Sequence, residues 1–254
     1  MGIMICPHKW VIFGMKNPLY PVVYGPVISW RLGISLGINP VPALNKICNF
    51  NCVYCELGDS ENCNERKEFI RSDVLSVALE DVKKYPAVDH ITIAGSGEPT
   101  LAANLHQIIT VIRSHNQAPI ALLTNGSLLN DSKVRESLAL VDKVIVKLDA
   151  DSADSFQRIN KPDPNVRYQT MIENMALFRQ SFHKVFCIQI MLCQQNATSA
   201  ISIGTLVTKL APDEIQICSP TRGGRTEPIP VEMFKKVVSN AFRGFTNVRT
   251  QYDA

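Results

Sequence analysis

The sequence predicts an α/β fold, a partial (β/α)6 TIM-type barrel with mostly parallel strands. Short apolar runs of strand length alternate with longer amphipathic stretches of helical period. Regular alternation of this kind implies a parallel sheet with right-handed crossovers. The alternation repeats about six times, whereas a closed barrel of this type has about eight units, so we expect an incomplete barrel.

The expected elements of the first half of the chain follow one another in regular order. They are strand 35–39, helix 72–84, strand 90–95, helix 101–114, strand 119–124 and helix 132–140. Ser72 or Asp73 can cap the first of these helices, in which apolar residues recur at helical spacing. The turn Asn125-Gly126 ends the third strand.

The second half of the chain continues the same alternation. Its expected elements are strand 143–149, helix 166–181, strand 184–193, helix 199–210, strand 214–219, helix 231–242 and a short final strand 247–251. Because side chains alternate along a strand, Val144, Val146 and Leu148 share one face of strand 143–149.

The chain of 254 residues is long enough for one large α/β domain with a sizeable core. Residues 1–33 are rich in proline and glycine and show no helical period. We interpret them as an irregular N-terminal extension that packs on the main domain, which then spans residues 34–254.

Composition excludes few functions but narrows the setting. The net charge of +3 is too small a bias to indicate nucleic-acid binding by itself. No apolar run reaches the ~18 residues that a membrane span needs, so we expect a cytoplasmic protein without membrane contact. Three of the eight cysteines lie within eight residues, and such clustering favours metal binding over disulfides.

The clustered thiols are Cys48, Cys52 and Cys55, directly after the first expected strand. Ligands of parallel α/β folds sit at the carboxyl ends of the strands. Thiolates are the usual ligands of iron–sulfur clusters, and three of them leave one iron of a [4Fe–4S] cluster open for a cofactor. A structural zinc knuckle, with Cys63 as the nearest fourth thiol, and chance clustering are the alternatives.

The CxxxCxxC spacing, with Tyr54 before the last cysteine, resembles that of the radical S-adenosylmethionine enzymes. The resemblance implies that the open iron chelates S-adenosylmethionine. It further implies reductive cleavage to methionine and a 5′-deoxyadenosyl radical, which abstracts hydrogen from a substrate. A reductant such as a flavodoxin or ferredoxin is then an expected partner.

Three further stretches at successive strand ends match the same family. Gly97-Glu98-Pro99 resembles the Gly-Gly-Glu segment that binds the methionine amino group, and Thr124-Asn125-Gly126 resembles a segment near the ribose and carboxylate. The run Lys147-Leu148-Asp149-Ala150 also matches. The resemblance covers roughly residues 20–225 and implies that Gly97, Glu98, Asn125 and Asp149 bind the cofactor.

A narrower resemblance is to predicted iron–sulfur oxidoreductases that are similar to the tRNA wyosine-forming enzymes. The stretches that carry it are Tyr24-Gly25-Pro26-Val27, Arg31-Leu32-Gly33, Ser35-Leu36-Gly37-Ile38-Asn39, Arg158-Ile159-Asn160-Lys161-Pro162 and Pro220-Thr221-Arg222. The chain departs from the subgroup at Trp30, where a basic residue is usual. The unknown substrate could on this resemblance be tRNA, and Lys147 is the candidate catalytic residue, because a lysine can form a Schiff base with a carbonyl compound such as pyruvate.

Two polar positions in expected strands have two interpretations each. Lys147 and Asp149 lie on one face of their strand, so they either pair with each other or serve substrate and ribose. Gln189 either bonds within the core or meets a ligand, and we take it as a candidate cofactor-binding residue. A non-catalytic iron–sulfur or zinc-binding protein is the alternative from another functional class.

Overall fold

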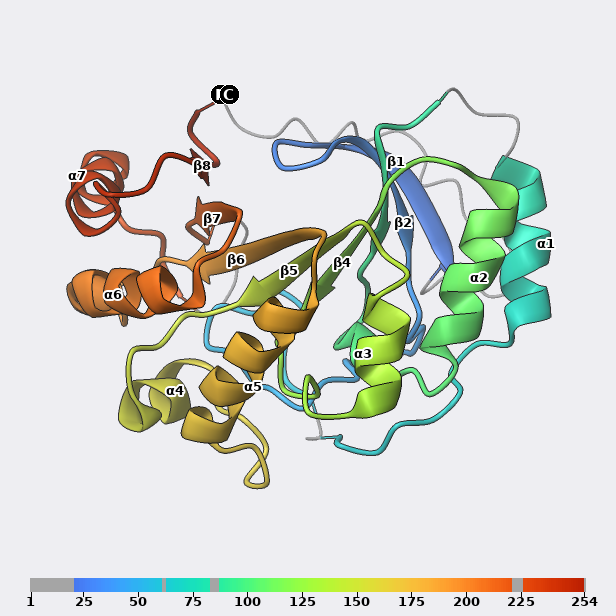
Figure 1. Cartoon of the computed structure of the whole chain (residues 1–254), viewed down its shortest axis with the longest axis horizontal. Helices are drawn as coiled ribbons and strands as arrows, with labels where there is room; N and C mark the ends of the chain where they lie inside the picture. Colours follow the sequence, from blue (N-terminus) through green and yellow to red (C-terminus); the bar gives the residue numbers. More distant parts are fainter. Residues whose placement is uncertain (1–20, 61–62, 83–86, 221–225, 254) are drawn as a thin grey trace.

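The computed structural model describes residues 21–60, 63–82, 87–220 and 226–253. Within these ranges, eight strands form one curved sheet in the order of the chain (Figure 1). They are β1 (Val23–Ser29), β2 (Gly33–Ile38), β3 (His90–Ile93), β4 (Ile120–Thr124), β5 (Lys143–Lys147), β6 (Val185–Met191), β7 (Glu214–Cys218) and β8 (Val248–Thr250). From β2 onward all neighbouring strands are parallel.

Helices follow the strands and lie around the outside of the sheet (Figure 1). They are α1 (Ser72–Val82), α2 (Leu105–His115), α3 (Ser132–Leu138), α4 (Ala153–Ile159), α5 (Tyr168–Ser181), α6 (Ala200–Leu210) and α7 (Val231–Ala241), with short 3-10 turns η1 (Pro99–Leu101) and η2 (Ala197–Ser199). The strands from β2 to β7 each lead into at least one helix, and this confirms the predicted partial barrel.

The prediction of an irregular segment over residues 1–33 is wrong for residues 23–29. These residues form β1, which pairs antiparallel with β2. Pro26 makes a strand difficult to predict from the sequence, because proline is expected only at edges and bulges of sheets. Here β1 is an edge strand, and its register shifts between Tyr24 and Val27, on either side of that proline. The predicted extension over residues 1–20 lies outside the described residues.

Helix α4 was also not expected from the sequence. Its N-terminus is a capping box in which Ser152 accepts a hydrogen bond from Ser155 N and the Ser155 side chain bonds back. The usual signature has glutamate or glutamine at the third position. Serine performs the same function here, and this departs from the usual sequence signature of a capping box.

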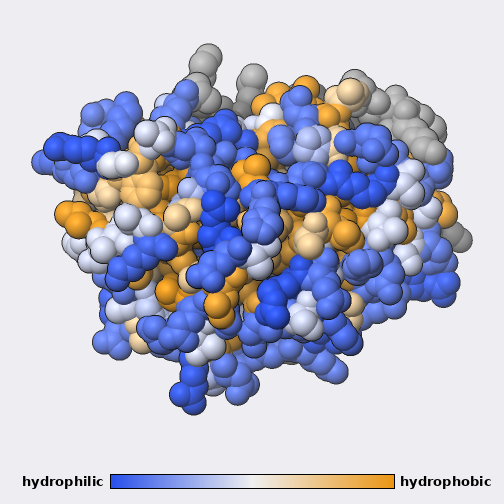
Figure 2. Space-filling view, viewed as in Figure 1, coloured by the Kyte–Doolittle hydropathy of each residue, from blue (hydrophilic) through white to orange (hydrophobic). Residues whose placement is uncertain are grey.

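Among the described residues, the core has two parts. The larger part lies between the sheet and the helices and includes the fully buried Phe50, Phe156 and Phe186. A small second cluster is made by Leu32, Ala121, Leu123, Ile145 and Cys187. Hydrophilic side chains cover most of the face in view, with hydrophobic ones between them (Figure 2). Within the described ranges, no helix has both the length and the apolar character that a membrane span requires.

Candidate functional site

A cavity of about 400 Å³ opens at the carboxyl ends of the strands. Its wall includes nearly every residue that the sequence predicted for the site, from elements far apart in the chain. These are Cys48, Cys52, Cys55, Gly97, Glu98, Asn125, Lys147 and Gln189. Asp149 is 2% exposed and lies behind Lys147 rather than on the wall. Ligand sites of parallel α/β folds are expected at this end of the sheet.

The cysteine loop is held on one side by backbone pairing with the segment after β3. Ile47 N donates to Ser96 O at 2.9 Å, and Glu98 N donates to Ile47 O at 2.8 Å. A Cβ atom at Gly97 would lie 1.6 Å from Ile47 O, so only glycine allows this approach. Gly97 therefore places the cysteine loop against the strand ends.

The other side of the loop is held by the last residue of α4 and by the segment after it. Asn51 N donates to Asn160 O at 3.0 Å, and Val53 N donates to Ile159 O at 2.9 Å. Asp163 N donates back to Asn49 O at 2.8 Å. Protein hydrogen bonds thus fix the loop on both sides.

Cys48, Cys52 and Cys55 are free thiols. Phe50 N donates to Cys48 Sγ at 3.4 Å, and Asn160 Nδ2 donates to Cys52 Sγ at 3.5 Å. Such donors favour thiolate ligands of a cluster. Burial, with a smaller effect from the charge of Glu98, raises the pKa of Cys48 to about 12. Burial also raises the pKa of Cys52. A metal must therefore displace protons from these thiols.

No three His, Cys, Asp or Glu side chains of the described residues converge in a way that suits a single metal ion. In a cluster each thiolate binds a separate iron, so the three sulfurs need not meet at one point. The donor set, three free thiols on one cavity wall with amide donors beside two of them, fits an iron–sulfur cluster.

Glu98 joins the ends of β3 and β4 through its carboxylate. Oε1 accepts from Thr100 N at 3.1 Å, from Thr100 Oγ1 at 2.6 Å and from Thr124 Oγ1 at 2.6 Å. Oε2 accepts from Asn125 N at 2.7 Å. Burial raises the pKa of this carboxyl group above its ordinary value. Glu98 lines the cavity, and its protein partners hold it rigidly there.

Asn125 connects the end of β4 to the cysteine loop. Its Nδ2 donates to Asn49 Oδ1 at 2.7 Å and lies 3.9 Å from Cys48 Sγ. Its Oδ1 accepts from Ser127 N at 2.9 Å. The residue therefore fixes the loop as well as lining the cavity.

Lys147 and Asp149 form the ion pair that the sequence left as one of two interpretations, with Nζ and Oδ1 3.1 Å apart. Asp149 also accepts from Met191 N at 2.7 Å, from Asn160 Nδ2 at 3.0 Å and from the Tyr54 hydroxyl. The Lys147 ammonium lies 5.0 Å from the centre of the Tyr54 ring. Apart from this ion pair with Asp149, Lys147 Nζ has no hydrogen-bond partner among the described residues.

Gln189 lies beside Lys147 in the sheet register and is 5% exposed. Its Nε2 has no partner among the described residues, so hydrogen bonding within the core does not explain it. The Nε2 of Gln216 donates to Glu214 Oε1 at 2.6 Å, whereas its own Oε1 has no hydrogen-bond partner among the described residues.

The remaining described cysteines are dispersed. Cys63 donates to Glu65 O at 3.7 Å and does not line the cavity. Cys187 belongs to the small apolar cluster, whereas Cys218 is on the cavity wall. Cys63 is therefore not a fourth ligand in this arrangement.

Asn160 is the residue whose role the sequence did not reveal. It bonds to Cys52, Tyr54 and Asp149 through one amide nitrogen. Its only sequence signal was the stretch Arg158-Ile159-Asn160-Lys161-Pro162, which carried no role. Lys161, which follows it, has a φ of 41° in the left-handed region. Arg222, in the last subgroup stretch, lies outside the described residues.

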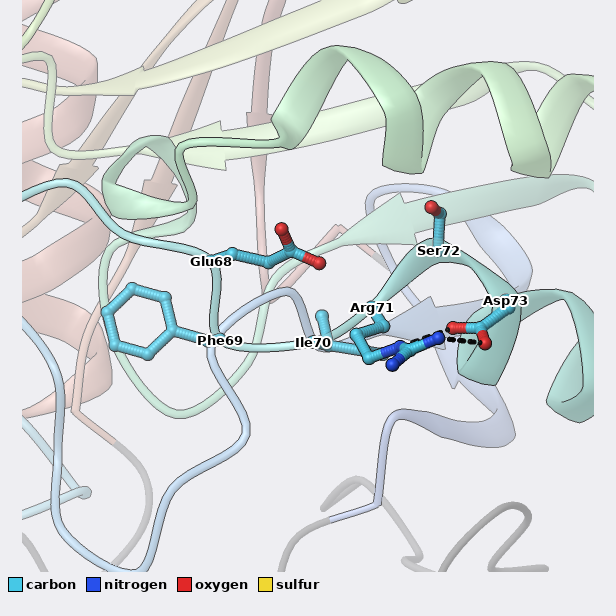
Figure 3. A pocket seen from close by; sticks show the side chains of 6 residues that line it. All are labelled: Glu68, Phe69, Ile70, Arg71, Ser72 and Asp73. Atoms are coloured by element: carbon cyan, nitrogen blue, oxygen red, sulfur yellow. Dashed lines mark hydrogen bonds and ion pairs between the residues drawn. The ribbon is translucent and has the colours of Figure 1, made fainter.

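A second hollow, of about 690 Å³, lies at the start of α1 (Figure 3). It is lined only by the contiguous residues 68–73, and its one ion pair joins Arg71 to Asp73 at 2.7 Å. Side chains from distant elements do not converge there as they do at the strand ends.

Comparison with known proteins gives a family. The model of the Radical SAM superfamily matches residues 44–197. A UPF0026 protein of Synechocystis sp. is 41% identical over 208 residues, which cover 81% of this chain and 78% of that protein. Some other relatives are longer, and the chain spans as little as 30% of their length.

Solved structures share the fold. Native anSMEcpe with bound AdoMet has a TM-score of 0.66 at 19% identity and covers 86% of this chain and 64% of its own. TYW1 with a lysine–pyruvate adduct bound has a TM-score of 0.63 at 16% identity and covers 83% of this chain and 73% of its own. At these identities the likeness shows the partial-barrel fold alone.

Proposed function

The chain belongs to the radical SAM superfamily, a superfamily of enzymes, and from this premise we propose that Cys48, Cys52 and Cys55 hold a [4Fe–4S] cluster. Such a cluster supplies one electron that cleaves bound S-adenosylmethionine into methionine and a 5′-deoxyadenosyl radical, which takes hydrogen from the substrate. The observation that carries the proposal is the set of three free thiols on the wall of one cavity.

The protein residues have separate tasks in this proposal. The three thiols bind three irons, and the donors Phe50 N and Asn160 Nδ2 stabilise their charge. Gly97, Glu98 and Asn125 form the wall next to the cysteine loop and hold the cofactor. Asp149 acts from behind the wall by fixing Tyr54 and Lys147.

Anaerobic reconstitution tests the cluster. We expect about four irons per chain in the wild type, and formation of 5′-deoxyadenosine when S-adenosylmethionine and a reductant are added. Cys52→Ala should abolish both. Cys63→Ala is the matched control, since Cys63 does not line the cavity, and should retain the iron of the wild type. Full cleavage activity in Cys52→Ala contradicts the proposal.

A second candidate function is tRNA modification of the wyosine type. The observation that favours it is the Lys147 ammonium, which is buried, makes no hydrogen bond and lies on the cavity wall. The structurally similar TYW1 carries a lysine–pyruvate adduct. A lysine held in this way can form a Schiff base with a carbonyl compound.

Borohydride trapping in the presence of pyruvate tests this candidate. A covalent mass increase on Lys147, lost in Lys147→Arg, supports it, whereas trapping that is unchanged in Lys147→Arg counts against it. Binding of tRNA should also weaken steeply as salt concentration rises, because phosphate contacts release counterions. Absence of tRNA binding at low salt excludes the wyosine type.

A further inference from the structure

The cavity wall has two chemically different halves. On the half next to the cysteine loop, the polar atoms of Glu98 and Asn125 form hydrogen bonds with other protein groups. The other half is formed by β5, by β6 and by the residues that follow β7 and β8. On that half, several buried donor atoms make no hydrogen bond to the described residues.

Four residues carry these unused atoms. Within the described part of the chain, these buried donor atoms have no hydrogen-bond partner: Lys147 Nζ, Gln189 Nε2, Ser219 Oγ and Gln251 Nε2. All four residues line the cavity. Gln189 is 5% exposed and Ser219 is 2% exposed. Buried polar groups nearly always have partners, and four without one on a single wall indicate that a ligand supplies them.

The positions of these atoms follow from the sheet. Lys147 and Gln189 are register partners across β5 and β6. Ser219 N donates to Gln251 Oε1 at 3.0 Å, which leaves the amide nitrogen of Gln251 available. Backbone register therefore fixes Lys147 and Gln189, and one hydrogen bond joins Ser219 to Gln251.

We propose that this wall of Lys147, Gln189, Ser219 and Gln251 is the substrate subsite, and that it binds acceptor oxygens of a carbonyl or carboxylate group. Three of the four atoms are nitrogens that only donate, and Lys147 is a cation, so acceptor oxygens fit this wall better than a cationic group, for which only the Ser219 hydroxyl among these four atoms could accept. In this proposal Gln189 binds the substrate, whereas the sequence suggested that it binds the cofactor. It rests on the proposed function, in which S-adenosylmethionine occupies the other half.

The stability of single variants tests the subsite without a known substrate. Gln189→Met and Ser219→Ala replace polar atoms that have no protein partner, so the Tm of the full chain should stay unchanged or rise. The matched control is Asn196→Leu. Asn196 is fully buried, and its amide makes three hydrogen bonds, with Cys193 N, Asp149 O and Met191 O. The Tm of Asn196→Leu should fall by several degrees. An equal fall in Gln189→Met and Ser219→Ala overturns the subsite.

Small probes test the ligand class. Acetamide or acetate should raise the Tm of the reconstituted protein with S-adenosylmethionine bound, and Gln189→Met should lose the rise. A rise with acetamide alone identifies a neutral carbonyl, and one with acetate alone identifies a carboxylate. Methylammonium, which only donates, should give no rise. A rise with methylammonium alone, or none with any probe, contradicts the proposal.

A titration separates this inference from the proposed function. If Gln189→Met weakens S-adenosylmethionine binding about tenfold or more, the residue belongs to the cofactor half and the subsite is wrong. If the wild type forms no 5′-deoxyadenosine, the proposed function fails, while the Tm comparison of the variants can still be made.

Discussion

Two carboxylates hold β5 at its two ends. After the strand, Asp149 receives bonds from Met191 N, Asn160 and Tyr54 and pairs with Lys147. Before the strand, Asp142 accepts from Ile120 N at 2.7 Å and pairs with the guanidinium group of Arg113. Asp149 therefore organises the cavity, and Asp142 joins α2 and β4 to the start of β5.

Asp142 gives a pH-dependent prediction. Partial burial on its own would raise the pKa of its carboxyl group, but the bonds from Arg113 and Ile120 N outweigh burial and hold the pKa below its ordinary value. The stability that this group contributes is therefore complete above its unfolded pKa of about 3.9 and is lost as pH falls through the folded pKa.

We expect Asp142→Asn to be less stable than the wild type at neutral pH and to approach it as pH falls below about 3.9. Urea unfolding at a series of pH values measures this. Arg113→Gln should likewise be less stable than the wild type at neutral pH, and this difference in stability should shrink as pH falls. A gap that stays constant from neutral to acidic pH shows that the carboxylate charge contributes nothing.

At the scale of elements, the cysteine loop is a docked segment between two supports. Ile47 pairs with Gly97 on one side, and Phe50 pairs with Pro162 on the other. The support by the segment after α4 depends on a helix that the sequence did not predict. The geometry of the three thiols is thus a property of neighbouring elements as much as of the loop.

Gly97→Ala tests the docking. Its new Cβ would meet the backbone oxygen of Ile47, which cannot move without shifting the loop. We expect a loss of about 1–3 kcal/mol in the free energy of unfolding, as for other overpacked sites, together with lower iron content after reconstitution. Gly244→Ala is the control, because its Cβ meets no atom within 4 Å, and it should change the free energy by less than about 0.5 kcal/mol. Equal iron content in both variants contradicts this role of Gly97.

At the scale of the whole molecule, the sheet does not close through strand pairing between β1 and β8. A side chain spans part of that gap. Arg249 of β8 donates to Trp30 O at 2.7 Å and to Arg31 O at 3.1 Å, in the turn between β1 and β2. Trp30 and Arg31 also line the cavity, so this contact connects the edges of the half-barrel to the site.

Arg249→Ala should lower the free energy of unfolding by about 1–2 kcal/mol, the worth of two exposed hydrogen bonds, and speed hydrogen exchange in the β1–β2 hairpin. Arg249→Lys should not restore the protection, since an ammonium group lacks the fork that reaches two carbonyl groups. Arg243→Ala, an exposed arginine after α7, serves as the control. Unchanged exchange in Arg249→Ala shows that the contact does not hold the edges together.

The sequence by itself determined the alternation of strands and helices and the residues that meet at the strand ends. Apolar periodicity and the CxxxCxxC spacing are local signals, and Gly97, Glu98 and Asn125 each follow a strand whose end parallel topology places at one edge. These features could therefore be predicted before the structure was known, with element ends displaced by a few residues.

Only the tertiary structure decided which partners the polar residues have. It paired Lys147 with Asp149, gave Asn160 three partners and left Gln189 with an unused amide nitrogen. It also made a strand of residues 23–29, because an edge position accepts a proline that a central strand would not. The physical reason is the same in each case. Hydrogen bonding and burial depend on groups that are distant in the chain, and local sequence patterns contain no information about those groups.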